Sequence, residues 1–535
     1  MKKLFLLTMG ALMSAVLWAS PRSLQQARMA APGMRHVHTM KVHGEPVMYV
    51  FDRPNEGGYM LISADDRAYT VLGYTDQGHW DANDIPANAQ AWLEMLSDEL
   101  QCIRTDASAA EEAPTYTPVA PLCTTQWSQK SPYNDLCPMW QNKHSATGCV
   151  ALAAAQIMKK HNYPTQGIGS HSYMWANENG DSIELSADFA NTTYAWSSML
   201  DQYDSTATDV QKNAVATLVY HCGVSDELNY GRSTGGNSHH MVMNLIDHFG
   251  YDKRIRTYRK NYQPDSLIMP EIASNLQNGR PIYVSAKTEE GGGHAFVCDG
   301  MDANGLLHIN WGWGGKSDGY YRLSAFAPQQ QGTGGSATNK AYTQDIRLYT
   351  RIRPNANGDY YSSFSCENIH PQLPVYHRDS AVRFVVDTFY NGGFTEWTGG
   401  LGIFIYKDGA QYKARTSKDH TPLRAGVYRQ RMSFAPYFTN REDYPEGTYE
   451  VEVAVRVGES KAAPLYCKNI GRWKCQMTIT ADSIYIVEPT ATMPEPEPEP
   501  TESFEQVREE MPQVEKILRD GILYIRRNGK EYTIL

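Results

Sequence analysis

The sequence predicts an α+β protein with a central mixed domain, a smaller α+β domain before it and a β-sandwich after it. The chain has 535 residues, which is longer than one ordinary domain, so two to four folded units are expected. Hydrophobic residues make up 41% and charged residues 20% of the chain, as in soluble globular proteins. Short β-prone runs occur towards both ends, and a helical run of small apolar residues lies between them.

The first residues have the pattern of an export signal. Residues 1–3 are a short basic start, residues 4–18 are mostly apolar, and the small residues Ala19 and Ser20 follow. A membrane anchor is the alternative, but the apolar run is shorter than the roughly 20 residues that span a bilayer. We therefore expect a signal peptide over residues 1–19, a protein that is secreted or held at the cell surface, and no integral membrane segment.

Residues 20–115 are expected to form the first folded unit. Three β-prone runs separated by turn residues predict a small meander; they are Val47–Phe51, Tyr59–Ser63 and Thr70–Tyr74. Apolar residues at helical spacing predict a helix from about Pro86 to Ile103. The stretch from Ala107 to Pro121 is rich in Ala, Glu, Thr and Pro, which predicts an exposed linker open to proteolysis.

Beyond Pro354 the pattern changes to alternating strands. Three β-rich runs predict a β-sandwich over residues 351–485; they are Val382–Tyr390, Leu401–Tyr406 and Glu450–Val457. The Pro-Glu alternation within residues 486–503 predicts a stiff, solvated linker. Asn528-Gly529 lies between two β-prone runs, so a hairpin is expected in a tail over residues 504–535.

The chain contains nine cysteines. Because nine is odd, at least one thiol stays unpaired unless it bonds to another molecule, and a leftover thiol in an exported protein is a candidate reactive group. Cys467 and Cys475 are close enough in sequence to pair, although two free buried cysteines are an equal alternative.

One cysteine has a distinctive setting. The run from Ala146 to Met158 is small and apolar nearly all round, which predicts a buried helix. Cys149 lies at its start, directly after Gly148, which allows a tight entry into the helix. A helix N-terminus favours thiolate over thiol. From this segment alone, a reactive cysteine and a small core cysteine both fit.

A candidate catalytic histidine, His294, follows Cys149 in the sequence. Three glycines lead into a predicted strand that begins at His294, and a turn connects it to a second strand that ends at Asn310. The order Cys, His, Asn, with the histidine about 130–150 residues after the cysteine, is typical of cysteine peptidases with a papain fold. The alternative is a structural histidine beside an aromatic hairpin.

Four phrases resemble the streptopain family of papain-fold cysteine endopeptidases. They are Ala146–Ala151, His161–Pro164, Gly292–Val297 and Asn310–Gly315. The resemblance covers roughly residues 120–350, and it is weaker over residues 20–110. It implies a papain-like catalytic domain over residues 116–350, with Cys149 as nucleophile and His294 as general base. It further implies that residues 20–115 are an inhibitory propeptide, removed during activation, and that the substrates are proteins or peptides.

Further site residues can be named beside this resemblance. The backbone N–H of Cys149 and the side chain of Gln129 are expected to bind the oxyanion, since a matching glutamine precedes Pro-Tyr-Asn in the family; Gln126 is the rival for this role. Asn310 is expected to orient His294. Trp311 and Trp313 could shield this hydrogen bond from water, or they could simply pack in the core. Three further candidates could touch the substrate or simply form turns: Ser233, Gly236 and Gly293.

Other functions find less support. The net charge of −10 disfavours nucleic acid as a partner. No zinc, phosphate-loop or Cys-x-x-Cys motif occurs, so no cofactor or metal is expected. His171, His239 and His240 are expected at the surface or in local packing. The alternatives to a cysteine endopeptidase are another Cys-His acyl-transfer enzyme, such as a transglutaminase-like protein, and an inactive cell-surface binding protein.

Overall fold

The computed structural model describes most of the chain in three folded bodies. It describes residues 21–53, 57–66, 68, 70–75, 79–81, 93, 97, 100, 115–288, 291–323, 342–354, 358–458, 461–489, 514–519, 522–527 and 530–534. The predicted signal peptide, most of the helix after Pro86, residues 107–114 of the predicted cleavage linker and the Pro-Glu linker lie outside these residues. Among the described residues, no helix is long and apolar enough to cross a membrane.

The first body contains the predicted meander, with helix α1 packed on it. Helix α1, which the sequence analysis did not predict, begins after a capping box in which Ser23 and Gln26 bond each other's backbone N–H. Four antiparallel strands follow, and they include all three predicted runs. The elements are α1 Leu24–Ala30, β1 Arg35–Val42, β2 Glu45–Asp52, β3 Tyr59–Ser63 and β4 Val71–Thr75.

The central body has helices on both faces of an antiparallel sheet. The helices are α3 Cys149–His161, α4 Asp209–Ser225, α5 Ser238–Asp247, α6 Asp265–Gln277 and the short η1 Trp196–Ser198. The sheet strands are β9 Arg256–Arg259, β10 Ile282–Lys287, β11 Gly293–Met301, β12 Leu307–Asn310, β13 Gly319–Tyr321 and β14 Gln344–Thr350. Two small hairpins are separate from it: β5 Met139–Trp140 with β6 Lys143–His144, and β7 Ser170–Ala176 with β8 Ser182–Asp188.

Alternation along the strands divides the central body into two cores. Ala295 and Val297 of β11 pack with α3, α4 and α5 in one core, whereas Phe296 and Cys298 pack with α6 in the other. Such alternation is the period-two pattern of a strand covered on both faces. The predicted hairpin is confirmed, because β11 and β12 pair antiparallel with Val297 opposite Asn310.

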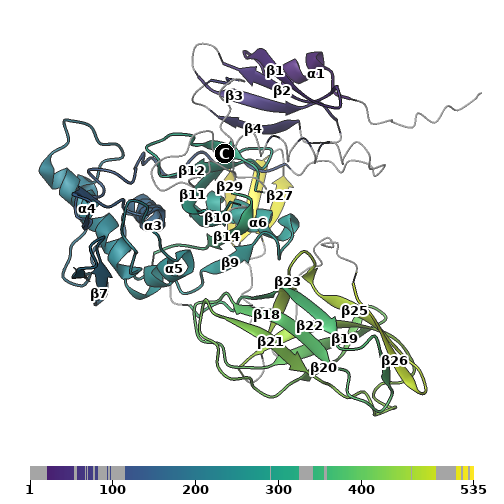
Figure 1. The fold of residues 1–535 in the computed structure, drawn as a ribbon. Helices are drawn as coiled ribbons and strands as arrows, with labels where there is room; N and C mark the ends of the chain where they lie inside the picture. Colours follow the sequence, from purple (N-terminus) through teal and green to yellow (C-terminus); the bar gives the residue numbers. More distant parts are fainter. Residues whose placement is uncertain are drawn as a thin grey trace, which may run out of the picture.

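The sheets of the first two bodies are continuous. Strand β4 pairs with β13, with Thr75 opposite Gly319 and Tyr74 opposite Tyr320. The rings of Tyr74 and Tyr320 stack at a centroid distance of 4.5 Å. The described strands thereby form one ten-stranded sheet that runs from β1 to β9, and Figure 1 shows the purple strands directly above the teal ones. The first body is therefore joined to the central one by backbone hydrogen bonds.

The third body is a curled β-sheet domain. All three predicted runs are strands, and its core contains large side chains such as Trp473 and Tyr449. The strands are β15 Phe364–Cys366, β16 Asn368–Pro371, β17 Val375–His377, β18 Phe384–Asn391, β19 Leu401–Lys407, β20 Ala410–Thr416, β21 Tyr428–Phe434, β22 Gly447–Val457, β23 Lys461–Cys467, β24 Gly471–Arg472, β25 Lys474–Ile479 and β26 Ser483–Val487.

The tail contains one more strand than predicted. The predicted hairpin corresponds to β28 and β29, and β27 adds to the outer side of β28. The strands are β27 Val514–Arg519, β28 Ile522–Arg527 and β29 Lys530–Ile534.

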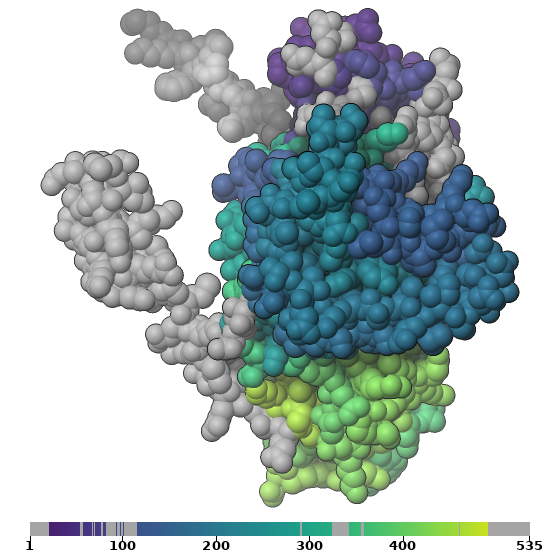
Figure 2. Space-filling model, turned by 90° about the vertical axis from the view of Figure 1, so that its left-hand side faces the viewer, coloured from purple at the N-terminus to yellow at the C-terminus, as the bar shows by residue number. Residues whose placement is uncertain are grey.

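The third body packs directly on the central one. Arg259 of β9 donates to Ser365 Oγ at 3.1 Å, and the Tyr262 hydroxyl donates to Glu367 at 2.5 Å. The ring of His239 stacks on Phe394 at 4.8 Å, so this histidine is a packing residue, as expected. Figure 2 shows the green surface of the third body in contact with the blue-teal surface of the central one.

A capping box supports the start of α4, and it can be tested. Thr208 Oγ1 accepts from the backbone N–H of Gln211 at 3.3 Å, and the Gln211 side chain accepts from the backbone N–H of Thr208 at 2.8 Å. Thr208→Ala is expected to lower the free energy of unfolding by about 1 kcal/mol. Urea unfolding followed by circular dichroism measures this loss. Thr208→Ser is the matched control, because it keeps the hydroxyl, and equal midpoints for all three proteins would contradict the role of the box.

Candidate active site

Cys149 is the first residue of α3, and it is buried. The helix is rich in small buried residues, since Ala151, Ala153, Ala154 and Ala155 are all 2% exposed or less. It ends as predicted, with Asn162 in the left-handed conformation before Tyr163-Pro164. Gly148 has a φ of 82°, and a Cβ there would lie 2.9 Å from Thr234 Cγ2. Only glycine fits this entry into the helix without strain.

The thiol of Cys149 has opposing influences on its ionisation. Burial raises its pKa, whereas hydrogen bonds from the backbone N–H groups of Ala295, Cys149 and Val150 act in the opposite direction. The net shift is upward, which favours the neutral thiol. The bond from Ala295 also locates the sulfur, because Ala295 follows His294 on β11.

His294 lies at the second position of β11 and is 2% exposed. Its Nε2 is 3.0 Å from the carbonyl oxygen of Trp311, and its Nδ1 is buried without a hydrogen-bond partner. Burial lowers the pKa of His294 to about 4, although the Trp311 carbonyl partly offsets this. The ring stacks on Trp313 at 4.7 Å and on Trp311 at 6.1 Å, so it packs against both indoles.

Cys149 and His294 are thus neighbours that do not form an ion pair in this structure. Neither ring nitrogen of His294 is hydrogen-bonded to the sulfur. Both pKa shifts favour the uncharged forms, a thiol and a neutral imidazole. The arrangement contains the two groups that nucleophilic catalysis requires, in a state that is not yet ionised.

Asn310 does not form the side-chain bond to His294 that the sequence predicted. Its Nδ2 donates to the carbonyl of Thr125 at 2.7 Å, and its Oδ1 accepts from the backbone N–H of Gly312 at 3.0 Å. The partner of His294 is instead the main-chain carbonyl of Trp311. The Trp311 carbonyl and the Gly312 N–H belong to the same peptide unit. Asn310 is therefore hydrogen-bonded to the peptide unit whose carbonyl is the partner of His294.

Gln129 is beside the turn that leads into Cys149. Its backbone carbonyl accepts from the N–H of Thr147 at 3.3 Å, and its side chain is 1% exposed. Neither the Nε2 nor the Oε1 of this amide has a hydrogen-bond partner, which is unfavourable for a buried polar group. The rival Gln126 is partly exposed, and its side chain lies next to Gly315. The structure therefore distinguishes the two glutamines.

The loop with Ser233 and Gly236 contacts the turn that leads into Cys149, through a residue that was not predicted. Thr234 is buried and donates from Oγ1 to the carbonyl of Ala146 at 2.6 Å. Ser233 and Gly236 are exposed, as is Gly293 at the start of β11. Nothing in the residue type of Thr234 distinguished it from its neighbours, because its role depends on a contact between distant segments.

Asp318 is a second residue that sequence reasoning missed. Its Oδ1 accepts from the backbone N–H of Trp311 at 2.9 Å, and burial raises its pKa to about 7. Asp318 directly precedes β13, so it connects the strand that meets the first body to the residue that bonds His294. An aspartate in a glycine-rich turn otherwise indicates only a turn.

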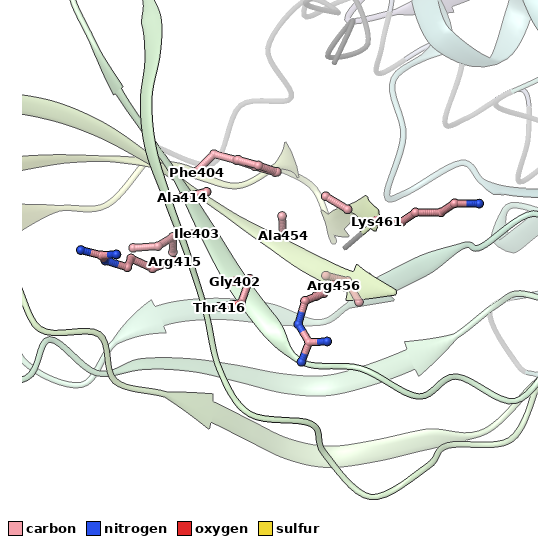
Figure 3. A pocket seen from close by; sticks show the side chains of 11 residues that line it. Gly402, Ile403, Phe404, Ala414, Arg415, Thr416, Ala454, Arg456 and Lys461 are labelled. Atoms are coloured by element: carbon pink, nitrogen blue, oxygen red, sulfur yellow. The ribbon is translucent and has the colours of Figure 1, made fainter. Parts of the chain in front are cut away.

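No cluster of three or more His, Cys, Asp or Glu side chains that could hold a metal occurs within the described ranges. A shallow pocket lies far from Cys149, on the third body, between β19, β20, β22 and β23 (Figure 3). Gly402 and Ala454 are among the residues that line it, and the guanidinium of Arg456 is already paired with Asp419. This pocket does not belong to the site at Cys149.

Two family models match the chain. The model of the Peptidase C10 family matches residues 127–321, and the model described as Spi protease inhibitor matches residues 8–100. Streptopain of Streptococcus pyogenes is 33% identical over 308 residues, which cover 54% of this chain and 77% of streptopain. The chain belongs to the peptidase C10 family. This confirms the predicted family, and the C10 chain is therefore a cysteine protease with an inhibitor-like domain before its protease domain.

Two further similarities involve other bacterial proteins. The thiol protease/hemagglutinin PrtT of Porphyromonas gingivalis is 30% identical over 342 residues, which cover 61% of the C10 chain and 39% of PrtT. A solved structure of a prointerpain A fragment from Prevotella intermedia aligns with 29% identity and a TM-score of 0.48, and it covers 61% of the C10 chain and 100% of the fragment.

Gly148→Ala is expected to impair activity more than stability. A methyl group at this position meets Thr234 and Leu228 at about 3 Å, which displaces the start of α3, and a displacement of about 1 Å can reduce the rate ~100-fold. Gly169→Ala is the matched control, because Gly169 also has a positive φ but has nothing within 4 Å of a Cβ. Initial rates of casein hydrolysis and thermal midpoints distinguish the two. Equal activity of both variants would show that the crowding at Gly148 does not matter.

Proposed function

We propose that Cys149 is the nucleophile and His294 the general base of this C10 protease, which hydrolyses peptide bonds within proteins. The observation that supports this most is the meeting of α3 with β11. Cys149 begins the helix, and its sulfur accepts a hydrogen bond from the N–H of the residue after His294. The helix N-terminus favours the thiolate once a proton acceptor is available.

The reaction follows from these two groups. His294 takes the thiol proton, and the thiolate attacks the carbonyl carbon of the scissile peptide bond. His294 then donates the proton to the leaving amine, and water hydrolyses the thioester on Cys149. The scheme requires no cofactor, only conditions that keep the thiol reduced.

The side chain of Gln129 is proposed to bind the oxyanion together with the backbone N–H of Cys149. Its amide is buried beside the nucleophile turn with no protein partner, and an oxygen of the substrate would satisfy it. A fixed donor of this kind stabilises the charge that develops on the carbonyl oxygen. Gln126 is partly exposed, so water can satisfy its amide and it needs no substrate oxygen as a partner.

Asn310 is proposed as a positioning residue. By accepting from the Gly312 N–H, it polarises and orients the peptide unit whose carbonyl faces Nε2 of His294. That carbonyl stabilises a proton on Nε2, which leaves Nδ1 as the nitrogen that exchanges a proton with Cys149.

The described state is proposed to be the latent precursor, with residues 20–115 as the enzyme's own inhibitor. A chain of contacts links the first body to the base: Tyr74 stacks on Tyr320 of β13, Asp318 precedes β13 and accepts from Trp311, and Trp311 holds His294. Release of the first body would remove the contact of Tyr74 with β13, so that β13, Asp318 and Trp311 would be less constrained. The ring of His294 could then turn Nδ1 towards the thiol, and the charged pair could form.

The remaining assignments concern the whole chain. We propose export after loss of residues 1–19, a catalytic domain over residues 116–350, a β-sandwich over residues 351–485, a linker over 486–503 and a tail over 504–535. The sandwich is supported by β23, which pairs with β22 through its first half and with β15 through its second half. Ser233, Gly236 and Gly293 are proposed to line the substrate cleft, with a preference for an apolar residue on the amino side of the scissile residue.

Latency gives a direct test of the nucleophile. The Cys149→Ala chain is expected to stay at full length, because it has no thiolate to cut itself, until wild-type enzyme is added. The wild-type chain should lose its amino-terminal part as activity appears, with a new terminus between about 105 and 121. Gel electrophoresis with amino-terminal sequencing measures both. Full activity in the uncut wild-type chain would overturn the inhibitory role of residues 20–115.

The two glutamines can be separated by kinetics. Gln129→Ala is expected to lower kcat by about 10²–10³ with little change in KM, because the lost donor acts on the transition state. Gln126→Ala is the matched control and should retain most of its activity. A larger loss of kcat in Gln126→Ala than in Gln129→Ala would reverse the assignment.

The role of Asn310 predicts a change in pH dependence. Asn310→Ala leaves the Gly312 N–H without its acceptor, so the Trp311 carbonyl becomes a weaker partner for protonated His294. We expect kcat to fall about 10-fold, as for the loss of about 1.4 kcal/mol, and the alkaline limb of kcat/KM to move to lower pH. Asn310→Asp keeps an acceptor for Gly312 and should restore part of that limb. An unchanged pH profile in Asn310→Ala would contradict the positioning role.

A further inference from the structure

Two cysteines of the third body lie directly opposite each other. Strands β15 and β23 run parallel, and Cys366 is the register partner of Cys467. Hydrogen-bonded neighbouring strands are about 4.8 Å apart, which lies within the range of about 4.4–6.8 Å between the Cα atoms of disulfide-bonded residues. The backbone therefore already has the spacing that a disulfide requires.

The two side chains also point the same way. Cys366 is 1% and Cys467 0% exposed, and both belong to the core of the third body. Each sulfur reaches across to the other strand: Cys366 Sγ is 3.9 Å from the carbonyl oxygen of Tyr466, and Cys467 Sγ is 3.8 Å from that of Glu367. The two thiols are close enough for each to shift the pKa of the other. No backbone movement is needed to bring the sulfur atoms together.

The other cysteine of this domain is less well placed. Cys475 lies on β25, and β22 separates β25 from β23 in the strand order. Two strand spacings are about 9.6 Å, which exceeds the separation that a disulfide bridges. The pairing of Cys467 with Cys475, considered from their closeness in sequence, is therefore not the one that the fold favours.

We propose that Cys366 and Cys467 form a disulfide bond when the chain folds in an oxidising compartment. The oxidant is a small-molecule or protein disulfide, reached before the core closes. The Cys467 thiolate attacks this disulfide, forms a mixed disulfide and releases one thiol. The Cys366 thiolate then attacks the Cys467 sulfur and releases the second thiol, so two thiols are oxidised and one disulfide is reduced.

The bond would fasten the part of the third body that contacts the protease domain. Ser365 and Glu367, on either side of Cys366, accept from Arg259 and Tyr262. Asn469, just after β23, donates from its backbone N–H to the carbonyl of Asn261 at 2.7 Å. A bond between the two strands would hold both sets of contacts in place. It would also restrict the unfolded chain, since it closes a loop of about 100 residues.

Peptide mapping tests the proposal on the full chain. The Cys149→Ala chain, which cannot digest itself, is folded in a mixture of oxidised and reduced glutathione, denatured, and its free thiols are blocked with N-ethylmaleimide. We expect the peptides of Cys366 and Cys467 to appear linked by mass spectrometry and Cys475 to carry the label. Labelling of both Cys366 and Cys467, or a link between Cys467 and Cys475, would overturn the proposal.

Thermal unfolding gives an independent readout. In the same background, dithiothreitol is expected to lower the unfolding midpoint of the third body by about 5 °C or more in the parent and in the control Cys475→Ala. Cys366→Ala and Cys467→Ala should show no such shift. An equal shift in Cys366→Ala and the parent would refute the bond, and if these variants fail to fold, the peptide map of the parent decides.

Discussion

The close packing of α3 against β11 is the constraint on which the site depends. Helix α3 is rich in buried alanines, so its axis can come near β11. Its first residue, Cys149, packs in the same core as Ala295, close to the start of that strand. The same helix limits the loop after β12, because a Cβ at Gly312 would lie 2.9 Å from Leu152 Cδ2. One contact surface thus fixes the cysteine, the histidine strand and the carbonyl that faces the histidine.

The unsatisfied polar groups near Cys149 are explained by function better than by stability. The amide of Gln129 and the Nδ1 of His294 are buried without partners, and a lone buried donor or acceptor costs about 1–3 kcal/mol. In the proposed reaction, the Gln129 amide would bind the substrate carbonyl oxygen and Nδ1 of His294 would take the proton of the Cys149 thiol. The side chains of Asn310, Thr234 and Asp318 around them are by contrast hydrogen-bonded to the backbone, which helps to fix the position of the neighbouring loops.

Local patterns predicted those parts of the fold that depend on neighbouring residues. The alanine run after Gly148 predicted α3, the glycines before His294 predicted the start of β11, and the Val alternation around residue 453 predicted β22. The partners of Asn310 could not be found in this way, because they depend on how Thr125 and Gly312 meet it in space. The contacts of Thr234 and Asp318 and the register of Cys366 with Cys467 could not be predicted either. They join segments that are far apart in the sequence.

The junction of β4 with β13 has a consequence for the enzyme after maturation. Loss of the first body would leave β13 as the edge of the remaining sheet, and unpaired edges invite other chains to add a strand. β13 spans only Gly319–Tyr321, and its contact with β4 involves two register pairs. So short an edge offers little backbone to which a strand of another molecule could add.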